Sequence, residues 1–208
     1  MRIVFVSPIF ASAAALALFA APGVAPAQQA TGAPAGNFRL TDMTGKTVSL
    51  DQFRGRPVVL EWTNSGCPFV QKHYDSGNMQ RTQAAAKASG AAWLTINSGA
   101  PGKQGHMTGL EARAYVAKTK AQPTAYLLDP AGKVGRGYAA KTTPHMYVID
   151  AEGVLRYQGG IDDKPTADKA DITGARNHVT AALGELKAGK PVSVAETRPY
   201  GCSVKYAG

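Results

Sequence analysis

PVVLEWTNSGCPFV, residues 57–70, contains the two features on which the fold prediction depends. Its first half, 57–63, is β-branched and aromatic with little polar relief, which is typical of a central strand covered on both faces. A turn at 64–66 then ends the strand, and Pro68 suits the first position of a helix. The stretch therefore predicts a strand-to-helix junction with Cys67 at the start of the helix.

Strands and helices alternate on both sides of this junction. Short alternating segments predict hairpins, and longer apolar runs predict buried strands. The predicted strands are 38–40, 47–50, 57–63, 92–97, 124–129, 145–150 and 154–159. The predicted helices are 68–89 with a bend at 76–78, 110–120 and 172–187, with a short helix or turn at 133–140. This order predicts an α/β sandwich with a mixed sheet, an N-terminal β-hairpin and one covering helix at the end.

Residues 1–27 have the features of a secretory signal peptide. Arg2 supplies the positive start, residues 3–20 are nearly all apolar, and 25–27 read APA, with small residues where a signal peptidase inspects the chain. A membrane anchor is the alternative, but the apolar run is short for a span and Pro8 interrupts it. We therefore expect cleavage after residue 27 and a secreted, periplasmic protein with no membrane partner.

The chain after cleavage, 181 residues (208 minus 27), is long enough for one well-buried domain. We expect a flexible lead-in at 28–36, a domain at 37–190 and a C-terminal tail at 191–208 that carries Cys202. The formal net charge of the full chain is +9, but Lys and Arg form no run of five or more. Spread charge of this kind is typical of a solvated surface, so no nucleic-acid partner is predicted.

The chain has two cysteines, Cys67 and Cys202, far apart in sequence. This excludes a Cys-X-X-Cys redox pair and a four-thiolate zinc site. His73 lies six residues after Cys67, a spacing that does not share one helix face, so no metal site is predicted there. No cofactor is predicted. The four histidines are expected to be ordinary hydrogen-bonded residues: His73, His106, His145 and His178.

Three motifs carry a resemblance to a known family: EWTNSGCPFV at 61–70, TPHMYVID at 143–150 and GCSVKY at 201–206. With the element order, they resemble the thioredoxin superfamily in its peroxiredoxin-like (redoxin, AhpC/TSA-type) branch, over 37–190. The resemblance implies a thioredoxin-like three-layer sandwich with a C-terminal extension.

Two positions depart from the family patterns. Val70 stands where thioredoxins carry a second cysteine, and Asn64 stands where peroxiredoxins carry a threonine. Cys67 corresponds to the nucleophilic cysteine of thioredoxin. The resemblance therefore implies thiol chemistry more securely than peroxide reduction.

The resemblance also implies substrate-binding residues. Pro144 corresponds to the cis-proline that faces the reactive sulfur in thioredoxin folds, and the backbone of Thr143 would meet an incoming chain. Trp62 precedes the junction and is either a substrate contact or, as a residue of a buried strand, a packing residue.

The position of Cys67 favours reactivity, since amide N–H groups at a helix start stabilise a thiolate. The alternative is a buried, inert cysteine. Cys202 is either a resolving thiol or the structural partner in a disulfide that closes a loop of about 135 residues and adds roughly 5 kcal/mol in the loop-entropy treatment.

These observations predict a thiol-dependent oxidoreductase that acts on protein thiols or disulfides, or on a small oxidised substrate, with Cys67 as the nucleophile. One alternative is a non-catalytic thioredoxin-fold module that binds a protein or a metal and holds a permanent Cys67–Cys202 disulfide. Another is a one-cysteine peroxide scavenger. The substrate, the electron donor and the oligomeric state are not predicted.

Overall fold

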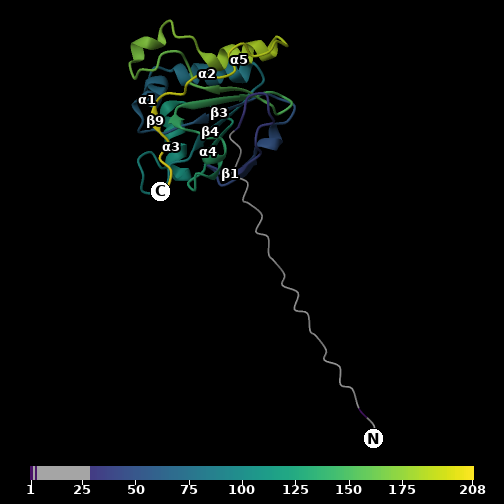
Figure 1. Cartoon of the computed structure of the whole chain (residues 1–208). Helices are drawn as coiled ribbons and strands as arrows, with labels where there is room; N and C mark the ends of the chain where they lie inside the picture. The colour runs from purple at the N-terminus through teal and green to yellow at the C-terminus, as the bar shows by residue number, and fades with distance from the viewer. Residues whose placement is uncertain (2, 4–28) are drawn as a thin grey trace.

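The computed structural model describes residues 1, 3 and 29–208 (Figure 1). The predicted signal peptide, 1–27, lies outside the described residues apart from the two isolated ones. Among the residues that are described, no helix combines the length and the apolar character that a membrane crossing needs.

A seven-stranded mixed sheet lies at the centre of the domain, in the order β2-β1-β5-β4-β3-β7-β8. The central strands β3, β4 and β5 are parallel, and β1, β2, β7 and β8 join antiparallel. These strands are β1 (Arg39–Asp42), β2 (Thr47–Ser49), β3 (Val58–Trp62), β4 (Ala92–Asn97), β5 (Ala125–Leu128), β7 (His145–Ile149) and β8 (Leu155–Gly159). A second, two-stranded sheet pairs β6 (Thr142–Thr143) with β9 (Cys202–Ser203).

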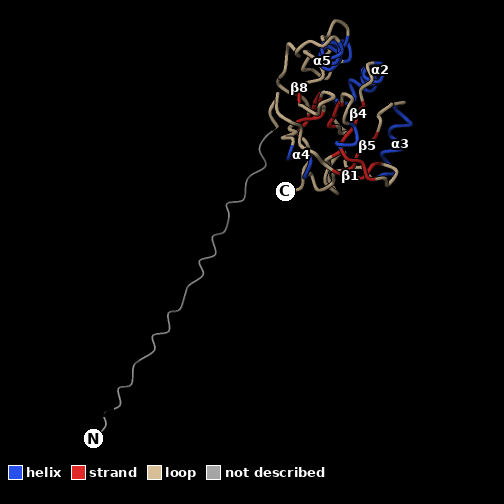
Figure 2. Tube along the Cα trace, turned by 90° about the vertical axis from the view of Figure 1, so that its right-hand side faces the viewer, coloured by secondary structure: helices blue, strands red, loops and turns tan. Residues whose placement is uncertain are grey.

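Helices cover both faces of the large sheet, with α2 and α5 side by side on one of them (Figures 1 and 2). They are α1 (Pro68–Asp75), α2 (Asn78–Ala88), α3 (Gly109–Thr119), α4 (Lys133–Gly137) and α5 (His178–Lys187), with short 3-10 turns η1 (Leu50–Phe53) and η2 (Lys169–Ile172). The predicted α/β sandwich with a mixed sheet, an N-terminal hairpin and a C-terminal extension is confirmed.

Alternation along β3 divides the core into two clusters. Leu60 and Trp62 belong to one cluster, together with Tyr147, whereas Val59 belongs to the other, together with Cys67. All five side chains are fully buried. Because successive side chains of a strand face opposite ways, β3 contributes to both hydrophobic layers.

Glu61, on the same strand, is a fully buried carboxylate with three hydrogen-bond donors. Its Oε1 accepts from the Tyr74 hydroxyl at 2.9 Å, and its Oε2 accepts from Trp93 Nε1 and Thr95 Oγ1, each at 2.9 Å. Burial raises the pKa of Glu61, and these hydrogen bonds offset only part of that effect. Since Tyr74 lies on α1, the carboxylate fixes that helix to the sheet.

Part of the segment predicted as a flexible lead-in, residues 32–35, is held by backbone hydrogen bonds to the domain. Gly32 N donates to Leu155 O at 2.7 Å, Ala35 N donates to Gly153 O at 2.9 Å, and Ala35 is buried. Residues 32–35 therefore lie along β8, which is the edge strand of the large sheet and has unpaired backbone groups to satisfy.

The last helix also begins later than the predicted residue 172. The Asn177 side chain accepts from Thr180 N at 3.0 Å and caps a helix that starts at His178. Gly174, with φ +80°, turns the chain just before this cap, and the backbone of 173–176 is not helical.

Candidate thiol site

Cys67 is the N-cap residue of α1, at the junction that the sequence predicts. The turn before it is held by Asn64, whose Oδ1 accepts from Gly66 N at 2.9 Å and whose carbonyl accepts from Cys67 N at 3.0 Å. The Asn64 amide in turn donates to Gln104 Oε1 at 3.1 Å. The glycine-rich loop around Gln104 thus fixes the position of the cysteine.

The Cys67 sulfur is fully buried. Its thiol donates to the carbonyl of Thr143 at 3.1 Å, and the backbone N–H of Cys202 donates to Sγ at 3.4 Å. The turn predicted at 64–66 indicated a sulfur exposed at the domain surface. The structure shows instead that the C-terminal tail covers it.

The tail reaches the sulfur as strand β9, antiparallel to β6. Thr143 pairs with Cys202, and Thr142 pairs with Ser203. The Thr143–Pro144 peptide bond is cis, as the family resemblance implies. Both cysteines are free thiols. Cys67 lies at the start of α1 and Cys202 lies on β9, and Thr143 contacts both of them.

The environment separates the acidities of the two thiols. Burial by itself raises the pKa of Cys67, but hydrogen bonds from the Cys202 thiol and from the amides of Val70 and Cys202 outweigh burial and bring that pKa below its ordinary value. Burial and the neighbouring Cys67 sulfur raise the pKa of Cys202 to about 11. Cys67 is therefore the thiolate former, and Cys202 keeps its proton and donates it in a hydrogen bond.

Tyr200, two residues before Cys202, anchors the tail. Its hydroxyl donates to Asp162 Oδ1 and lies 3.2 Å from His73 Nε2. Its ring packs edge-on against Phe69, with centroids 6.0 Å apart. The His73 ring is itself oriented by Asn78, whose amide nitrogen lies 2.8 Å from Nδ1. Tyr200 thus connects the tail to the helix that Cys67 begins.

Trp62 does not lie beside the sulfur. Its ring is fully buried in the other core cluster, where it packs against Tyr138 and Tyr147, and its Nε1 donates to Ser98 Oγ at 3.0 Å. The substrate-contact interpretation of Trp62 is therefore replaced by the packing one.

The histidines are hydrogen-bonded with one exception. His73, His106 and His145 each have a partner on a ring nitrogen, whereas Nδ1 of His178 is buried without one. Within residues 29–208 no group of three or more His, Cys, Asp or Glu side chains is arranged to hold a metal ion.

Sequence reasoning missed two residues that hold the tail, Tyr200 and Asp162, and it named Gly201 only as part of the motif at 201–206. The signal for a docked tail was present in the spacing. Tyr200, Cys202, Val204 and Tyr206 are spaced by two, as in a strand with one buried face.

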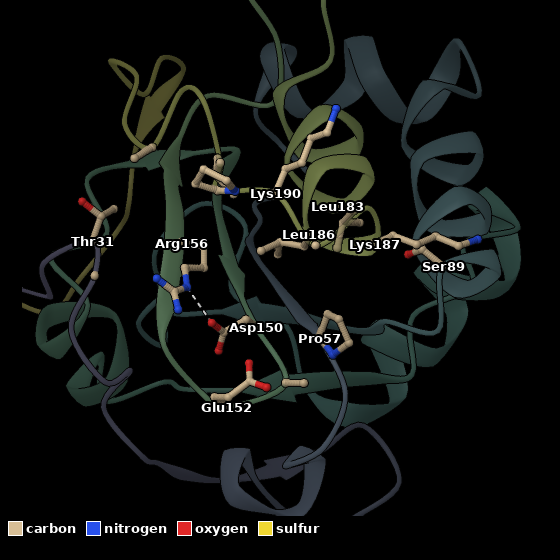
Figure 3. Close-up of a pocket in the computed structure, with 16 residues that line it drawn as sticks. Thr31, Pro57, Ser89, Asp150, Glu152, Arg156, Leu183, Leu186, Lys187 and Lys190 are labelled. Atoms are coloured by element: carbon tan, nitrogen blue, oxygen red, sulfur yellow. Dashed lines mark hydrogen bonds and ion pairs between the residues drawn. The ribbon is translucent and has the colours of Figure 1, made fainter.

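A cavity of about 720 Å³ is lined by neither of the two cysteines. Figure 3 shows the residues around it. Pro57, before the start of β3, lines it, whereas Cys67 follows the other end of that strand. Its walls combine leucines of α5 with an Arg156–Asp150 ion pair. No cysteine lines it, so this cavity is not part of the thiol site.

Comparisons with known proteins agree with this geometry. The AhpC/TSA family profile matches residues 31–158, more than half of the chain. No curated protein matches the chain.

Three solved structures illustrate the shared fold. An uncharacterized conserved protein from Geobacillus kaustophilus is 24% identical with a TM-score of 0.72, covering 91% of this chain and 98% of that one. A secreted disulfide oxidoreductase from Mycobacterium tuberculosis, homologous to E. coli DsbE, is 20% identical with a TM-score of 0.51, covering 70% and 95%. The peroxidoxin BcpB from Mycobacterium tuberculosis is 18% identical with a TM-score of 0.56, covering 76% and 99%. The predicted thioredoxin-like, redoxin-type fold is confirmed.

Proposed function

Because this chain belongs to the AhpC/TSA family, we propose that it is a thiol-dependent oxidoreductase in which Cys67 is the nucleophile and Cys202 the resolving thiol. The observation that carries the proposal is the hydrogen bond from Cys202 N to Cys67 Sγ, which places the second cysteine at the first. Thiol–disulfide exchange requires such proximity, because one sulfur must attack the other.

The unequal acidities support this division of roles. A nucleophile must be ionised, and hydrogen bonds lower the pKa of Cys67. A resolving thiol acts only after a mixed disulfide has formed, and until then Cys202 stays protonated, because burial and the neighbouring Cys67 sulfur raise its pKa to about 11. Once Cys67 is in a disulfide its negative charge is gone, so one cause of the high pKa of Cys202 disappears.

The reaction is a balanced exchange of sulfurs. The Cys67 thiolate attacks one sulfur of a substrate disulfide, a Cys67–substrate bond forms, and the other substrate sulfur leaves as a thiolate. Cys202 then loses its proton and attacks Cys67 Sγ, which forms the Cys67–Cys202 disulfide and releases the second substrate thiol. The substrate gains two electrons, and the protein dithiol supplies them.

Disulfide substrates are favoured over peroxides by the environment of Asn64. This residue stands where peroxiredoxins carry a threonine, and its side chain is engaged by Gly66 and Gln104. An asparagine has no hydroxyl to orient a peroxide at the sulfur, and the amide that stands in its place is already hydrogen-bonded.

Single cysteine variants test the proposal. Cys67→Ser should abolish reduction of a disulfide protein such as insulin, whereas Cys202→Ser should accumulate a mixed disulfide that intact mass detects. The oxidised wild-type protein should weigh two hydrogens less than the reduced one. Activity in Cys67→Ser would contradict the enzyme proposal.

A permanent disulfide is the competing interpretation, in which the domain would be a non-catalytic binding module. The two are separated by equilibration of the native protein in glutathione buffers of graded potential. A redox pair becomes reduced while the domain remains folded, as followed by Trp fluorescence. A structural disulfide is reduced only when the chain unfolds.

We also propose that the protein works outside the cytoplasm. The support is the signal-like composition of residues 1–27 and the oxidising compartment in which such a dithiol would meet disulfides. N-terminal sequencing of the protein from a cell-envelope fraction should read from Gln28.

A further inference from the structure

The end of the tail is bound to the domain as a peptide ligand would be. β9 pairs antiparallel with β6. The pairing extends one residue further, because Val204 N donates to Lys141 O at 3.1 Å. Val204 packs against one core cluster, and Cys202 packs against the other. The residues that alternate with these two are Ser203 and Lys205, and Lys205 Nζ donates to Ser203 Oγ at 3.2 Å. Alternate side chains of the tail therefore face the domain, as in strand addition.

Gly201 fits a position where a side chain is excluded. Its φ is +125°, and a Cβ atom there would come 2.1 Å from Thr143 O and 2.8 Å from Thr143 C. The backbone of a bound strand must approach the Thr143–Pro144 peptide this closely for the next residue to reach Cys67. The surface thus requires glycine immediately before the cysteine.

Two tyrosines fix the register on either side of the cysteine. Tyr200, at position −2, inserts its hydroxyl between Asp162 and His73. Tyr206, at position +4, donates to Ala140 O at 2.8 Å, and its ring lies 4.6 Å from the Arg136 guanidinium. Aromatic anchors of this kind contribute much of the affinity of peptide interfaces.

The chain just before residues 200–206 is held by contacts of its own. Thr197 is held firmly, because its Oγ1 lies 2.7 Å from the Tyr157 hydroxyl and accepts from Gly160 N at 3.0 Å. Arg198, the next residue, is exposed. A cavity of about 470 Å³ lies beside the segment, lined in part by Thr197, Tyr200 and Gly201. Release of residues 200–206 would therefore begin at Arg198 and leave the contacts of Thr197 in place.

We propose that the surface beneath residues 200–206 binds one class of partner in trans, an extended polypeptide with the pattern Tyr-Gly-Cys-x-Val-x-Tyr, and that the tail competes with it. This inference rests on the proposed function, since it names the polypeptide whose sulfur Cys67 would attack. The glycine at −1 and the tyrosines at −2 and +4 are the features that select the partner.

Activated peptides test this selection. The full chain carrying Cys202→Ser is mixed with the peptide PYGCSVKYA, whose cysteine is in a mixed disulfide with thionitrobenzoate. The Cys67 thiolate attacks the peptide sulfur, a Cys67–peptide disulfide forms, and one coloured thionitrobenzoate anion leaves for each protein. The release rate reports recognition, and the product mass identifies the bond.

Two control peptides keep the reactive group and change one feature each. YPGCSVYKA has the same composition with both tyrosines shifted by one residue, and PYACSVKYA has alanine at −1. We expect the matched peptide to react at least about tenfold faster than either control, the difference that 1.4 kcal/mol of binding free energy provides. Equal rates for the three peptides would overturn the inference.

Dithiobis(nitrobenzoate), which has no peptide part, separates this inference from the proposed function. If Cys67 reacts with this reagent but does not distinguish the peptides, only the inference fails. If Cys67 reacts with neither, the proposed function fails as well. Adding Tyr200→Ala to the Cys202→Ser chain should raise the rate of the matched peptide several-fold, since its own tail no longer competes. An unchanged rate in that variant would also contradict the competition.

Discussion

The backbone N–H of Cys202 donates a hydrogen bond to the Sγ of Cys67, 3.4 Å away, although 135 positions of sequence separate the two residues. The same contact covers the sulfur and stabilises its anion. The charge state of Cys67 therefore depends on whether the tail is docked, which makes tail variants informative about the thiol.

Cys202→Ala should raise the pKa of Cys67, because it removes the thiol that donates to the Cys67 anion. Cys202→Ser retains a donor and should raise it less. At neutral pH we expect Cys67 in the alanine variant to be alkylated by iodoacetamide about two- to tenfold more slowly than in the serine variant. Thiolate absorbance against pH gives the two pKa values directly, and identical curves would contradict the role of the Cys202 thiol.

Tyr200→Phe should loosen the tail, since it leaves Asp162 and His73 without the hydroxyl that joins them. We expect a loss of about 1–3 kcal/mol in the free energy of unfolding. We also expect several-fold faster alkylation of Cys67, because access to a fully buried sulfur should increase by more than loss of the Cys202 donors lowers its ionised fraction. Tyr206→Phe is the matched control, because its hydroxyl serves one carbonyl, that of Ala140. Alkylation that is equally fast in both variants would argue against Tyr200 as the anchor nearest the sulfur.

Glu61→Ala should cost about 3 kcal/mol or more, because three buried donors lose their acceptor and a cavity forms. The free energy of unfolding of Glu61→Gln should depend on pH differently from that of the wild type. The pKa of Glu61 is raised on folding, so the stability contributed by its protonated form is present below the ordinary value of 4.5 and is lost as pH rises through the folded value. Urea unfolding from pH 4 to 8 should therefore show wild type losing stability with rising pH relative to Glu61→Gln.

Acid should destabilise the domain through His73, because burial outweighs the opposite effect of the Asp162 carboxylate and, with a smaller contribution from the Lys72 charge, lowers the pKa of His73 to about 4. A lowered pKa in a base means stability that is present above 6.5 and is lost as pH falls through 4. Between pH 7 and 5 the loss from this residue is about 2 kcal/mol. His73→Gln should lose correspondingly less stability over that interval in urea unfolding, and a parallel loss in both proteins would exclude His73 as the cause.

The strand-to-helix junction at Cys67 and the positions of the buried strands along the chain were predictable, because the apolar runs of β3 and β4 are buried on both faces and Pro68 marks a helix start. The order of the strands within the sheet was not predicted, since it depends on pairing between segments far apart in sequence. The helix beginning at 178 was not, since the Asn177 cap acts within a stretch whose composition also suits a helix. Local pattern defines the interior of an element better than its ends.

The burial of Cys67 by the C-terminal tail could not be predicted from the local sequence pattern. Tyr200 is held by Asp162 and His73, which lie 38 and 127 positions away in sequence. Contacts of that range arise from the topology, which brings α1 and the loop after β8 to the same end of the sheet. The residues that carry the chemistry, Cys67 and Cys202, were nevertheless identifiable from the sequence because cysteine is so rare in this chain.

The first part of the tail, residues 195–197, lies along β8, the outermost strand of the sheet. Gln158 N donates to Ala195 O at 3.0 Å, and Thr197 N donates to Gln158 O at 3.1 Å. Bare strand edges recruit other chains and lead to aggregation. If residues 200–206 leave their surface, as we propose, this pairing keeps the outermost strand covered while the sulfur is exposed. Opening of the thiol site would therefore create no new bare strand edge at which another chain could pair.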